Sequence, residues 1–285
     1  IPAIFAKKLF KAPIYFWVQD LWPESLTAAG GVNNKLVLGF FNSLTKFIYN
    51  HSKKVLIQSN GFREYILNQG IPNDKIIYYP NPTEDFYKPL QEVKEYQEFF
   101  QNEFFNIIFA GNIGEAQSFK TIINAINNVK ELPVKVIVLG DGRYKETAIC
   151  LIKEKGLESY FNFLGSFPPI EMPKFFSHAD ALLVSLKKNK IFSLTIPAKI
   201  QSYLACGKPI IASIDGEGAK IVIDAKCGVT SPAEDSLKLS EAIKELMALG
   251  KSKRSEMGNN GRAYYEKEFE RDGLLKRLEV IFNSK

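Results

Sequence analysis

The sequence predicts an α/β fold with mostly parallel strands, because short apolar runs alternate with amphipathic helical segments along its 285 residues. Glycine-containing turns follow several of these runs, as is usual where a strand leads into a helix. Apolar side chains make up 46% of the chain, which is enough to fill the cores of the one large or two ordinary domains that this length allows. We therefore expect two α/β domains in succession.

The first α/β series occupies residues 1–82. Its predicted strands are 14–19, 54–58 and 76–79, and its predicted helices are 33–50 and 60–68. The Y-P-N-P turn after the third strand contains two prolines, so regular structure is expected to end there. A doubly wound sheet has about six strands, and a three-stranded parallel piece leaves an edge uncovered. We therefore expect further N-terminal residues to complete this domain.

A polar and charged stretch, residues 83–104, is interpreted as an interdomain connection with some helix. The second series covers residues 105–269, with predicted strands at 106–110, 134–139, 161–164, 181–185 and 210–211. Its predicted helices end near residues 130, 155, 178 and 207, and two more occupy 236–249 and 255–269. A last amphipathic helix is predicted at 270–282.

Three turns of the second series place glycine directly after a predicted strand: Gly111-Asn112-Ile113-Gly114, Gly140-Asp141-Gly142 and Gly165-Ser166. Because ligands of parallel α/β sheets bind beyond the carboxyl ends of the strands, all three turns lie on the ligand side of the predicted sheet. Glycine permits positive φ and a close approach to the backbone. The turns favour a nucleotide cleft, and the alternative is that they are ordinary connections between strand and helix.

The stretch from Ser193 to Ser213 predicts a loop, a short helix, a glycine stop and a buried strand. Pro197 suits the first turn of a helix, and Gly207 suits its end. The start of such a helix offers unpaired N–H groups and a positive dipole end, which suit a phosphate. Lys199 adds a positive charge in the first turn. This segment is therefore a candidate for holding the diphosphate of a nucleotide.

Taken in order, these motifs resemble those of the family 4 (group 1) glycosyltransferases, in particular the bacterial branch that builds O-antigen and capsular polysaccharide. The similar segments are F-A-G-N-I-G, V-L-G-D-G, F-L-G-S-F, A-D-A-L-L-V-S-L, I-P-A-K-I-x-x-Y-L-A-C-G-K-P-I-I-A and D-G-E-G-A. V-Q-D-L-W-P-E-S, which ends at Ser25, is similar to the V-R-D-L-W-P-E-S segment of that branch. The resemblance covers nearly the whole chain.

This resemblance implies a GT-B fold, in which two Rossmann-like domains face a cleft. It implies that residues 105–269 bind a UDP- or GDP-sugar as donor and that residues 1–82 bind the acceptor, with 270–285 packing back on the first domain. Transfer in this family retains the anomeric configuration and needs neither a metal nor a cofactor. The implied acceptor is a glycan or a sugar carried on a polyprenyl diphosphate, and the implied process is the synthesis of surface polysaccharide.

The resemblance also implies roles for individual residues. Asp20 and Glu24 are implied to be catalytic acids near the transferred sugar, and their alternative roles are a loop residue and a helix-cap acid. Nucleotide or diphosphate contacts are implied for Gly111, Asn112, Gly114, Gln117, Gly140, Asp141, Gly142, Leu164, Gly165, Ser166, Thr195, Ile196, Pro197, Lys199 and Ser202. Because Asn112 and Gln117 stand where many relatives carry Arg and Lys, backbone N–H groups and Lys199 are expected to bind more of the diphosphate.

The sequence departs from the family pattern at two acidic positions. The family places two glutamates eight positions apart around the short helix, and here these positions hold Leu194 and Ser202. The second glutamate normally binds the ribose hydroxyls, whereas a serine offers one short hydroxyl. Glu217, in D-G-E-G-A, is a candidate to compensate through a contact with the sugar.

Two other functions stay open. The missing strands and the two lost glutamates are compatible with a truncated or degenerate protein that binds nucleotide or another transferase without turnover. A GT-B-like sugar-nucleotide epimerase would need acid and base carboxylates in the cleft. A dehydrogenase is disfavoured, because no G-x-G-x-x-G motif follows a predicted strand with an acidic residue about 20 positions on.

Charge and cysteine content restrict the partners and the location. The net charge is +6, but the basic residues are scattered and Lys far outnumbers Arg, so nucleic-acid binding is not expected. Three cysteines without a C-x-x-C pair indicate reduced thiols and a cytoplasmic protein. The two histidines, His51 and His178, are too few for a histidine-rich metal site. No apolar run is long enough to span a bilayer.

The predicted helix 33–50 has a broad apolar face edged by lysines. One explanation is that this face packs on the sheet of the first domain. The other is that the helix lies in the interface of an anionic membrane, which would place the protein at the inner face of the cytoplasmic membrane.

Overall fold

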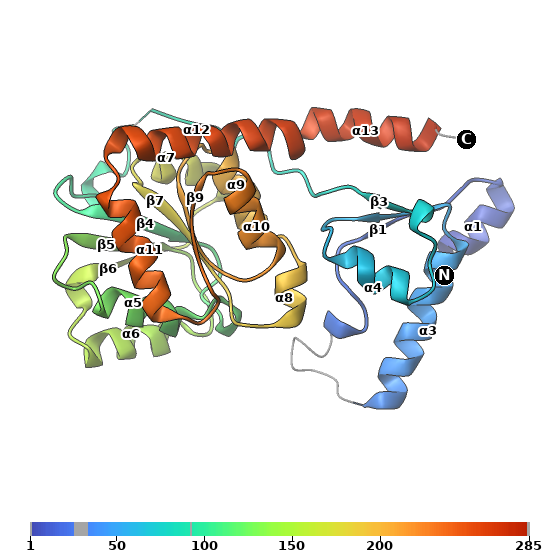
Figure 1. Ribbon diagram of the computed structural model, residues 1–285, viewed down its shortest axis with the longest axis horizontal. Helices are drawn as coiled ribbons and strands as arrows, with labels where there is room; N and C mark the ends of the chain where they lie inside the picture. The colour runs from blue at the N-terminus through green and yellow to red at the C-terminus, as the bar shows by residue number, and fades with distance from the viewer. Residues whose placement is uncertain (1, 26–33, 92, 284–285) are drawn as a thin grey trace. The chain divides into compact units, whose positions relative to one another are not determined.

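The computed structural model describes residues 2–25, 34–91 and 93–283. The chain forms two compact units, which are described separately. Unit 1 contains Ile1–Asn81 and Asn189–Ile196, and unit 2 contains Pro82–Lys188 and Pro197–Lys285. Figure 1 labels the helices and strands of both.

Unit 1 is built on a parallel sheet of three strands in the order β1-β2-β3. Its strands are β1 Tyr15–Val18, β2 Lys54–Ile57 and β3 Ile76–Tyr78, and its helices are α1 Pro2–Phe10, α3 Lys35–His51, α4 Phe62–Asn68 and α8 Lys190–Leu194, with a 3₁₀ turn at Asn73–Lys75. The three predicted strands are confirmed to within one residue at each end. The sequence signal is strong here because each strand is a short β-branched or aromatic run.

Helix α8 stands where a loop was predicted. Asn189 begins it, because its Oδ1 accepts a hydrogen bond from the N–H of Ile191 at 2.8 Å. Leu194, the last residue of α8, packs against the core of unit 1. Its carbonyl accepts a hydrogen bond from Ser59 Oγ at 2.5 Å. This short segment therefore belongs to unit 1, although its neighbours in sequence belong to unit 2.

Unit 2 contains a parallel sheet of six strands in the order β6-β5-β4-β7-β8-β9. The strands are β4 Phe105–Ala110, β5 Val134–Leu139, β6 Phe161–Gly165, β7 Ala181–Ser185, β8 Ile210–Ser213 and β9 Gly228–Ser231. From β4 the chain builds the sheet outward to β6, and it then returns to β4 and builds in the other direction. The carboxyl ends of β4 and β7 therefore flank a topological switch point, which is the usual place for a ligand.

The helices of unit 2 cover its sheet as Figure 1 shows. They are α5 Phe119–Asn127, α6 Lys145–Glu154, α7 Met172–Ser177, α9 Ala198–Ala205, α10 Glu217–Asp224, α11 Ser236–Ala248, α12 Lys251–Glu268 and α13 Arg271–Asn283, with 3₁₀ turns at Gln97–Phe99, Glu115–Gln117, Glu158–Tyr160 and Pro169–Glu171. The main core lies between β4, β5 and β7 and the apolar faces of α5, α6 and α11. Each of these helices contributes residues spaced three or four apart, such as Leu239, Ala242, Ile243 and Leu246.

Two elements of unit 2 were not predicted, and one begins earlier than predicted. Helix α10 begins after Gly216 and contains Gly218, and two glycines weaken a helical signal. Strand β9 is a four-residue edge strand that is defined by its pairing with β8. Helix α12 begins at Lys251 instead of Ser255 and is strongly polar, so its start has no apolar pattern to mark it.

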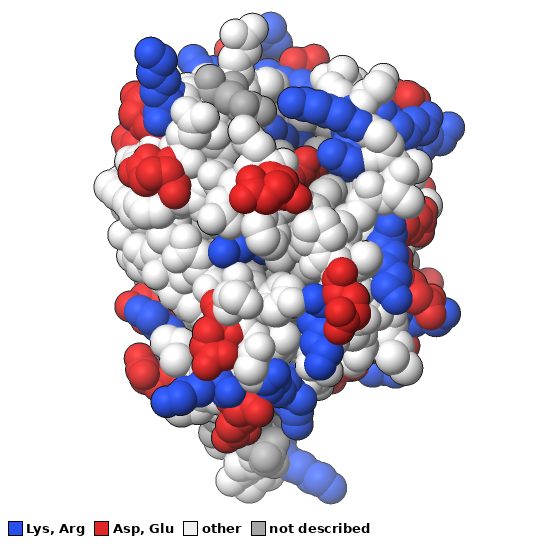
Figure 2. Space-filling view, turned by 90° about the vertical axis from the view of Figure 1, so that its left-hand side faces the viewer, with Lys and Arg blue, Asp and Glu red and all other residues white. Residues whose placement is uncertain are grey.

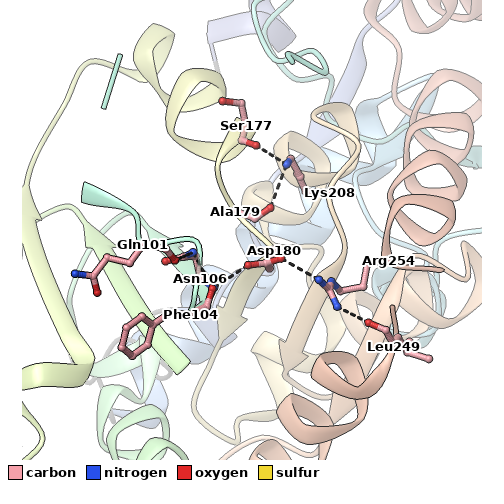
Figure 3. A network of polar contacts seen from close by, with 9 residues as sticks. All are labelled: Gln101, Phe104, Asn106, Ser177, Ala179, Asp180, Lys208, Leu249 and Arg254. Carbon is pink, nitrogen blue, oxygen red and sulfur yellow. Dashed lines mark hydrogen bonds and ion pairs between the residues drawn. The ribbon is translucent and has the colours of Figure 1, made fainter. Parts of the chain in front are cut away.

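A polar network joins the amino ends of the central strands to their neighbours (Figure 3). Asp180, just before β7, accepts a hydrogen bond from the backbone N–H of Asn106 at 2.9 Å and pairs with Arg254 of α12 at 3.1 Å. Lys208 Nζ donates to the carbonyls of Ser177 at 2.6 Å and Ala179 at 3.1 Å. This network holds α7 and α12 on the sheet, at the end opposite to the predicted ligand side.

The connecting segment, residues 83–104, groups with unit 2 and contains the 3₁₀ turn at Gln97–Phe99. It runs beside α9, since a Cβ added to Gly207 would lie 3.4 Å from Pro89 Cγ. Helix α13 also groups with unit 2. Its packing against the first domain stays a prediction.

Helix α3 leaves much of its apolar surface exposed. Asn34 Oδ1 caps its start by accepting the N–H of Leu36 at 2.9 Å. Leu36 is 84% exposed, Phe40 64% and Phe47 44%. Packing on the sheet therefore accounts for only part of the apolar face of the helix. Among the described helices, none is both long enough and apolar enough to cross a membrane.

Candidate functional site

A cavity of about 490 Å³ opens at the carboxyl ends of the strands of unit 2, beside the topological switch point. Seven of the residues that were predicted to bind nucleotide line it: Gly111, Asn112, Gly140, Asp141, Ser166, Lys199 and Ser202. They come from the turns after β4, β5 and β6 and from helix α9. Sequence positions nearly 100 residues apart therefore meet at one hollow of the sheet.

The other predicted residues do not line this cavity. Gly114, Gln117, Gly142, Leu164, Gly165 and Pro197 lie in or beside the same turns, and Glu217 is the first residue of α10. Thr195 and Ile196 belong to unit 1.

The glycine turns pack directly on one another. The N–H of Gly111 donates to the carbonyl of Leu139 at 2.7 Å, and that of Gly140 donates to Gly165 at 2.7 Å, so the sheet ladder continues beyond the strands. Gly140 has φ +140°, and a Cβ there would collide with the carbonyl of Gly111. Glycine is therefore required at this position by the approach of two backbone segments.

Several backbone N–H groups of the turns are engaged within the protein. Besides Gly111 and Gly140, Gly114 N–H donates to Gln117 Oε1 at 3.1 Å and Gly142 N–H donates to Asp141 Oδ1 at 2.7 Å. The sequence predicts that N–H groups of these turns share the binding of a diphosphate with Lys199. These four N–H groups are already engaged within the protein, and the diphosphate contacts stay a prediction.

Lys199 has a buried amine without a hydrogen-bond acceptor among the described residues. Its Nζ lies 3.8 Å from the centroid of the Phe109 ring. The absence of a side chain at Gly111 makes room for it, since a Cβ there would lie 2.7 Å from Lys199 Cε. Burial disfavours the ammonium form and lowers the pKa of Lys199 to about 7. An unpaired cation in this position is suited to receive an anion.

Aromatic side chains form another part of the cavity wall. Tyr87 and Phe176 stack with their ring centroids 6.5 Å apart, and Phe176 meets Tyr203 edge to face at 5.3 Å. Tyr203 Oη accepts the N–H of Ala110 at 3.2 Å, which fixes α9 against the end of β4. Phe167 also lines the cavity. Such a wall can hold the flat ring of a nucleobase.

Of the lining residues that the sequence did not predict, Thr83, Glu84 and Tyr87 lie farthest in sequence from the predicted motifs. They come from the connecting segment, which has neither a glycine turn nor a strand end to mark it. The only signal was the group of an acid and aromatic residues directly after the Y-P-N-P turn.

The two positions that lack glutamates have different surroundings. Ser202 lies on α9 in the cavity wall, and its Oγ donates a hydrogen bond to the carbonyl of Lys199 at 3.0 Å. Leu194 is an apolar packing residue of unit 1. Neither position therefore supplies a carboxylate to a ligand.

In unit 1, the two predicted catalytic acids line different hollows. Asp20 is exposed and lines a cavity of about 280 Å³ together with Trp22 and Phe41. Glu24 is half-buried, lines an open hollow of about 600 Å³ and accepts a hydrogen bond from Tyr65 Oη. Burial and the nearby Glu24 carboxylate raise the pKa of Tyr65 above its usual range.

Basic and acidic side chains are interspersed on the face shown in Figure 2, and that face has no large patch of a single charge. Among the described residues, no group of three or more His, Cys, Asp or Glu side chains comes together as a metal site would require. Metal independence of the reaction stays a prediction.

A model of a known protein family matches most of unit 2. Residues 91–264, more than half of the chain, match the model of the family described as Glycosyl transferases group 1. The comparison with curated proteins finds no match.

Solved structures of low sequence identity share the fold. HepE from Anabaena, in complex with UDP and glucose, is similar with a TM-score of 0.80 and 15% identity over 99% of this chain and 74% of that chain. A glycosyltransferase from Rickettsia africae has a TM-score of 0.75 at 16% identity, over 99% and 80% of the two chains. WaaG, a glycosyltransferase involved in lipopolysaccharide biosynthesis, has 0.69 at 13% identity, over 96% and 76%. The chain has the Rossmann-like GT-B fold that the motifs implied.

Proposed function

We propose that this chain, which belongs to the glycosyl transferases group 1 family, moves a sugar from a nucleoside diphosphate sugar to a glycan or a lipid-linked acceptor. The observation that carries the proposal is the unpaired amine of Lys199 at a cavity walled by turns at the switch point of the sheet. An aromatic wall for a base and a buried cation for a diphosphate meet in this one hollow. A nucleoside diphosphate presents the complementary groups.

Lys199 would stabilise the leaving diphosphate. When the bond between the sugar and the diphosphate breaks, negative charge grows on the departing oxygen, and a positioned ammonium lowers the energy of that state. In the free protein the pKa of about 7 leaves Lys199 partly neutral at neutral pH. Binding of the dianionic diphosphate favours the charged form, so the donor binds with uptake of a proton. We propose that transfer retains the anomeric configuration and proceeds without a metal or another cofactor.

Asp20 and Glu24 would act on the sugar or the acceptor. Asp20 is the better candidate, because it is exposed in a hollow that contains the indole of Trp22, a side chain on which sugars stack. Glu24 is held by Tyr65. We therefore expect Asp20→Asn to lower turnover while donor binding is kept, and Glu24→Gln to disturb the fold of unit 1 as well.

Uracil is the base that we propose for the donor, since HepE, a structural neighbour, has been solved with UDP and glucose. Isothermal titration calorimetry of UDP, GDP and their sugars against the chain tests this. Lys199→Met should weaken the binding of UDP at least tenfold, whereas Lys153→Met, a change on the exposed side of α6, should leave it unchanged. If the chain bound neither UDP nor GDP, the proposed function would be wrong.

A non-catalytic nucleotide-binding protein is the second candidate. Leu194 and Ser202, which stand in place of two glutamates, favour it. Release of UDP from UDP-sugars in the presence and absence of glycan acceptors separates the two candidates. Tight binding of UDP with no turnover of any UDP- or GDP-sugar would support the non-catalytic function.

We also propose that unit 1 contacts an anionic membrane, where polyprenyl-linked acceptors reside. Exposed Leu36, Phe40 and Phe47 of α3 can enter the headgroup region, and neighbouring lysines can each add about 1 kcal/mol near anionic lipid. Liposomes with anionic lipid should carry the chain upward in flotation at low salt. Leu36→Ser with Phe40→Ser should abolish this, and Leu237→Ser, at an equally exposed apolar residue of α11, should not. No lipid dependence in the wild-type chain would contradict it.

A further inference from the structure

The cavity of unit 2 contains two acidic side chains, Glu84 and Asp141. Asp141 is engaged in its own turn, because Oδ1 accepts the N–H of Gly142 at 2.7 Å and Oδ2 lies 3.4 Å from Lys145 Nζ. These contacts lower the pKa of Asp141 and hold its charge in place. The Glu84 carboxylate accepts one long hydrogen bond, from the hydroxyl of Thr83 at 3.3 Å, among the described residues. Glu84 therefore retains most of its capacity to accept hydrogen bonds.

The segment that carries Glu84 is anchored along helix α9. A turn holds the segment, since the N–H of Tyr87 donates to the carbonyl of Glu84 at 3.0 Å. Farther on, the backbone N–H of Lys88 reaches the thiol of Cys206, and Pro89 lies against Gly207.

Ring contacts join the same segment to the middle of α9. Tyr87 stacks on Phe176, which meets Tyr203, the neighbour of Ser202. The segment therefore follows α9 from its end toward the cavity, with Glu84 on the cavity side.

A nucleotide in this cavity needs an acceptor for the two hydroxyls of its ribose. Ser202 cannot serve both, because its only proton is donated to the carbonyl of Lys199 and its single oxygen is left as an acceptor. A carboxylate has two oxygens and can accept from both hydroxyls of a vicinal diol. Glu217, considered earlier for compensation, is not among the residues that line the cavity.

We propose that Glu84 binds the ribose diol of the nucleotide, in place of the acid that is absent at Ser202. This inference rests on the proposed function, since it assumes a nucleoside diphosphate in the cavity. It adds a binding residue from the connecting segment, outside the part of the chain that matches the family model. It also explains how a chain without the usual glutamate can still select a ribonucleotide.

A double-mutant cycle between protein and ligand tests the pairing. Calorimetry measures the affinities of UDP and 2′,3′-dideoxy-UDP for the wild-type chain, for Glu84→Gln and for Asp141→Asn. The wild-type chain should prefer UDP about tenfold or more, because two hydrogen bonds to a charged group are lost with the diol. In Glu84→Gln this preference should shrink to about threefold or less, mainly through weaker binding of UDP.

The control variant and the ligand pair separate the possible failures. Asp141→Asn should keep the preference for the diol, and loss of the preference in that variant instead of Glu84→Gln would overturn the inference. Equal weakening of UDP and dideoxy-UDP by Glu84→Gln would also overturn it and would leave the proposed function standing. Absence of binding of either ligand, and of GDP, by the wild-type chain would overturn the proposed function together with this inference.

Discussion

The unpaired amine of Lys199 lowers the stability of the fold but favours the binding of an anion. Its amine is buried against Phe109 with no acceptor among the described residues, so the folded state bears the cost of an unsatisfied charge. Lys208 provides the contrast, because its partly buried amine donates to the carbonyls of Ser177 and Ala179. The sequence could predict the charge at position 199, but it could not show whether a lysine amine would have acceptors, as Lys208 has, or none.

Removal of the unpaired amine should stabilise the fold. We expect Lys199→Met to raise the free energy of unfolding of unit 2 by about 1–3 kcal/mol at neutral pH. Lys208→Met should lower it by a similar amount, because it leaves two carbonyls without their donor. Urea denaturation followed by far-UV circular dichroism measures the free energy of unfolding of both variants. Destabilisation by Lys199→Met would mean that the amine has a partner in solution.

The pKa of Lys199 leads to a dependence on pH with a definite sign. The folded value of about 7 lies below the unfolded value of about 10.4, so between these pH values the unfolded chain binds more protons. Stability should therefore rise with pH in this window, and it should do so less in Lys199→Met.

Binding of UDP should change with pH in the opposite direction. Above pH 7 the free amine is mostly neutral and must take up a proton to pair with the diphosphate. The affinity for UDP should therefore decrease by up to about tenfold for each unit of pH. Calorimetry at pH 8.5 in buffers of different ionisation enthalpy should detect uptake of one proton. A proton count of zero in the wild-type chain, equal to that of Lys199→Met, would contradict this role.

Helix α12 shows how one element depends on a close approach to another. Gly258 lies directly over the carbonyl of Gly207, the residue that ends α9, and a Cβ at position 258 would overlap that oxygen. Arg262, one turn later, donates to the carbonyl of Ala205 at 2.8 Å. Together these contacts hold α12 on the helix that carries Lys199 and Ser202. The position of Lys199 and Ser202 in the cavity therefore depends on the packing of α12, although α12 does not line the cavity.

Substitution of Gly258 should separate this packing from helix propensity. Alanine favours a helix by about 1 kcal/mol over glycine, but the clash with Gly207 should outweigh this and destabilise unit 2 by about 1–3 kcal/mol. Gly250→Ala, at the start of the same helix with open space around it, should change stability by less than about 1 kcal/mol. Urea denaturation of both variants checks the difference. An unchanged midpoint for Gly258→Ala would show that the two helices can move apart.

At the level of the whole molecule, two units with separate cores should unfold in separate steps. The core of unit 1 gathers around Tyr49, Val55 and Ile57, and that of unit 2 lies between its sheet and α5, α6 and α11. A ligand that binds one unit stabilises that unit by about 2.7 kcal/mol at 100 times its dissociation constant. Differential scanning calorimetry should thus show two transitions, of which UDP raises mainly the one of unit 2. A single transition that UDP moves as a whole would contradict independent cores.

The sequence by itself determined the α/β class, the parallel strands and the glycine turns and helix start that form part of the cavity wall. This was possible because apolar runs, glycine turns and the start of α9 are local signals, and because strand ends of a parallel sheet lie on a common side. The strands of unit 1 and those from β4 to β8 follow from such patterns.

Only the tertiary structure decided which groups remain available to a ligand. Whether the N–H groups of Gly111 and Gly140 are engaged depends on the packing of one turn against the next. The place of Glu84 depends on contacts between the connecting segment and α9, which lie more than 100 positions apart in sequence. Such long-range contacts have no local pattern, because they arise from the way in which surfaces fit once the elements have formed.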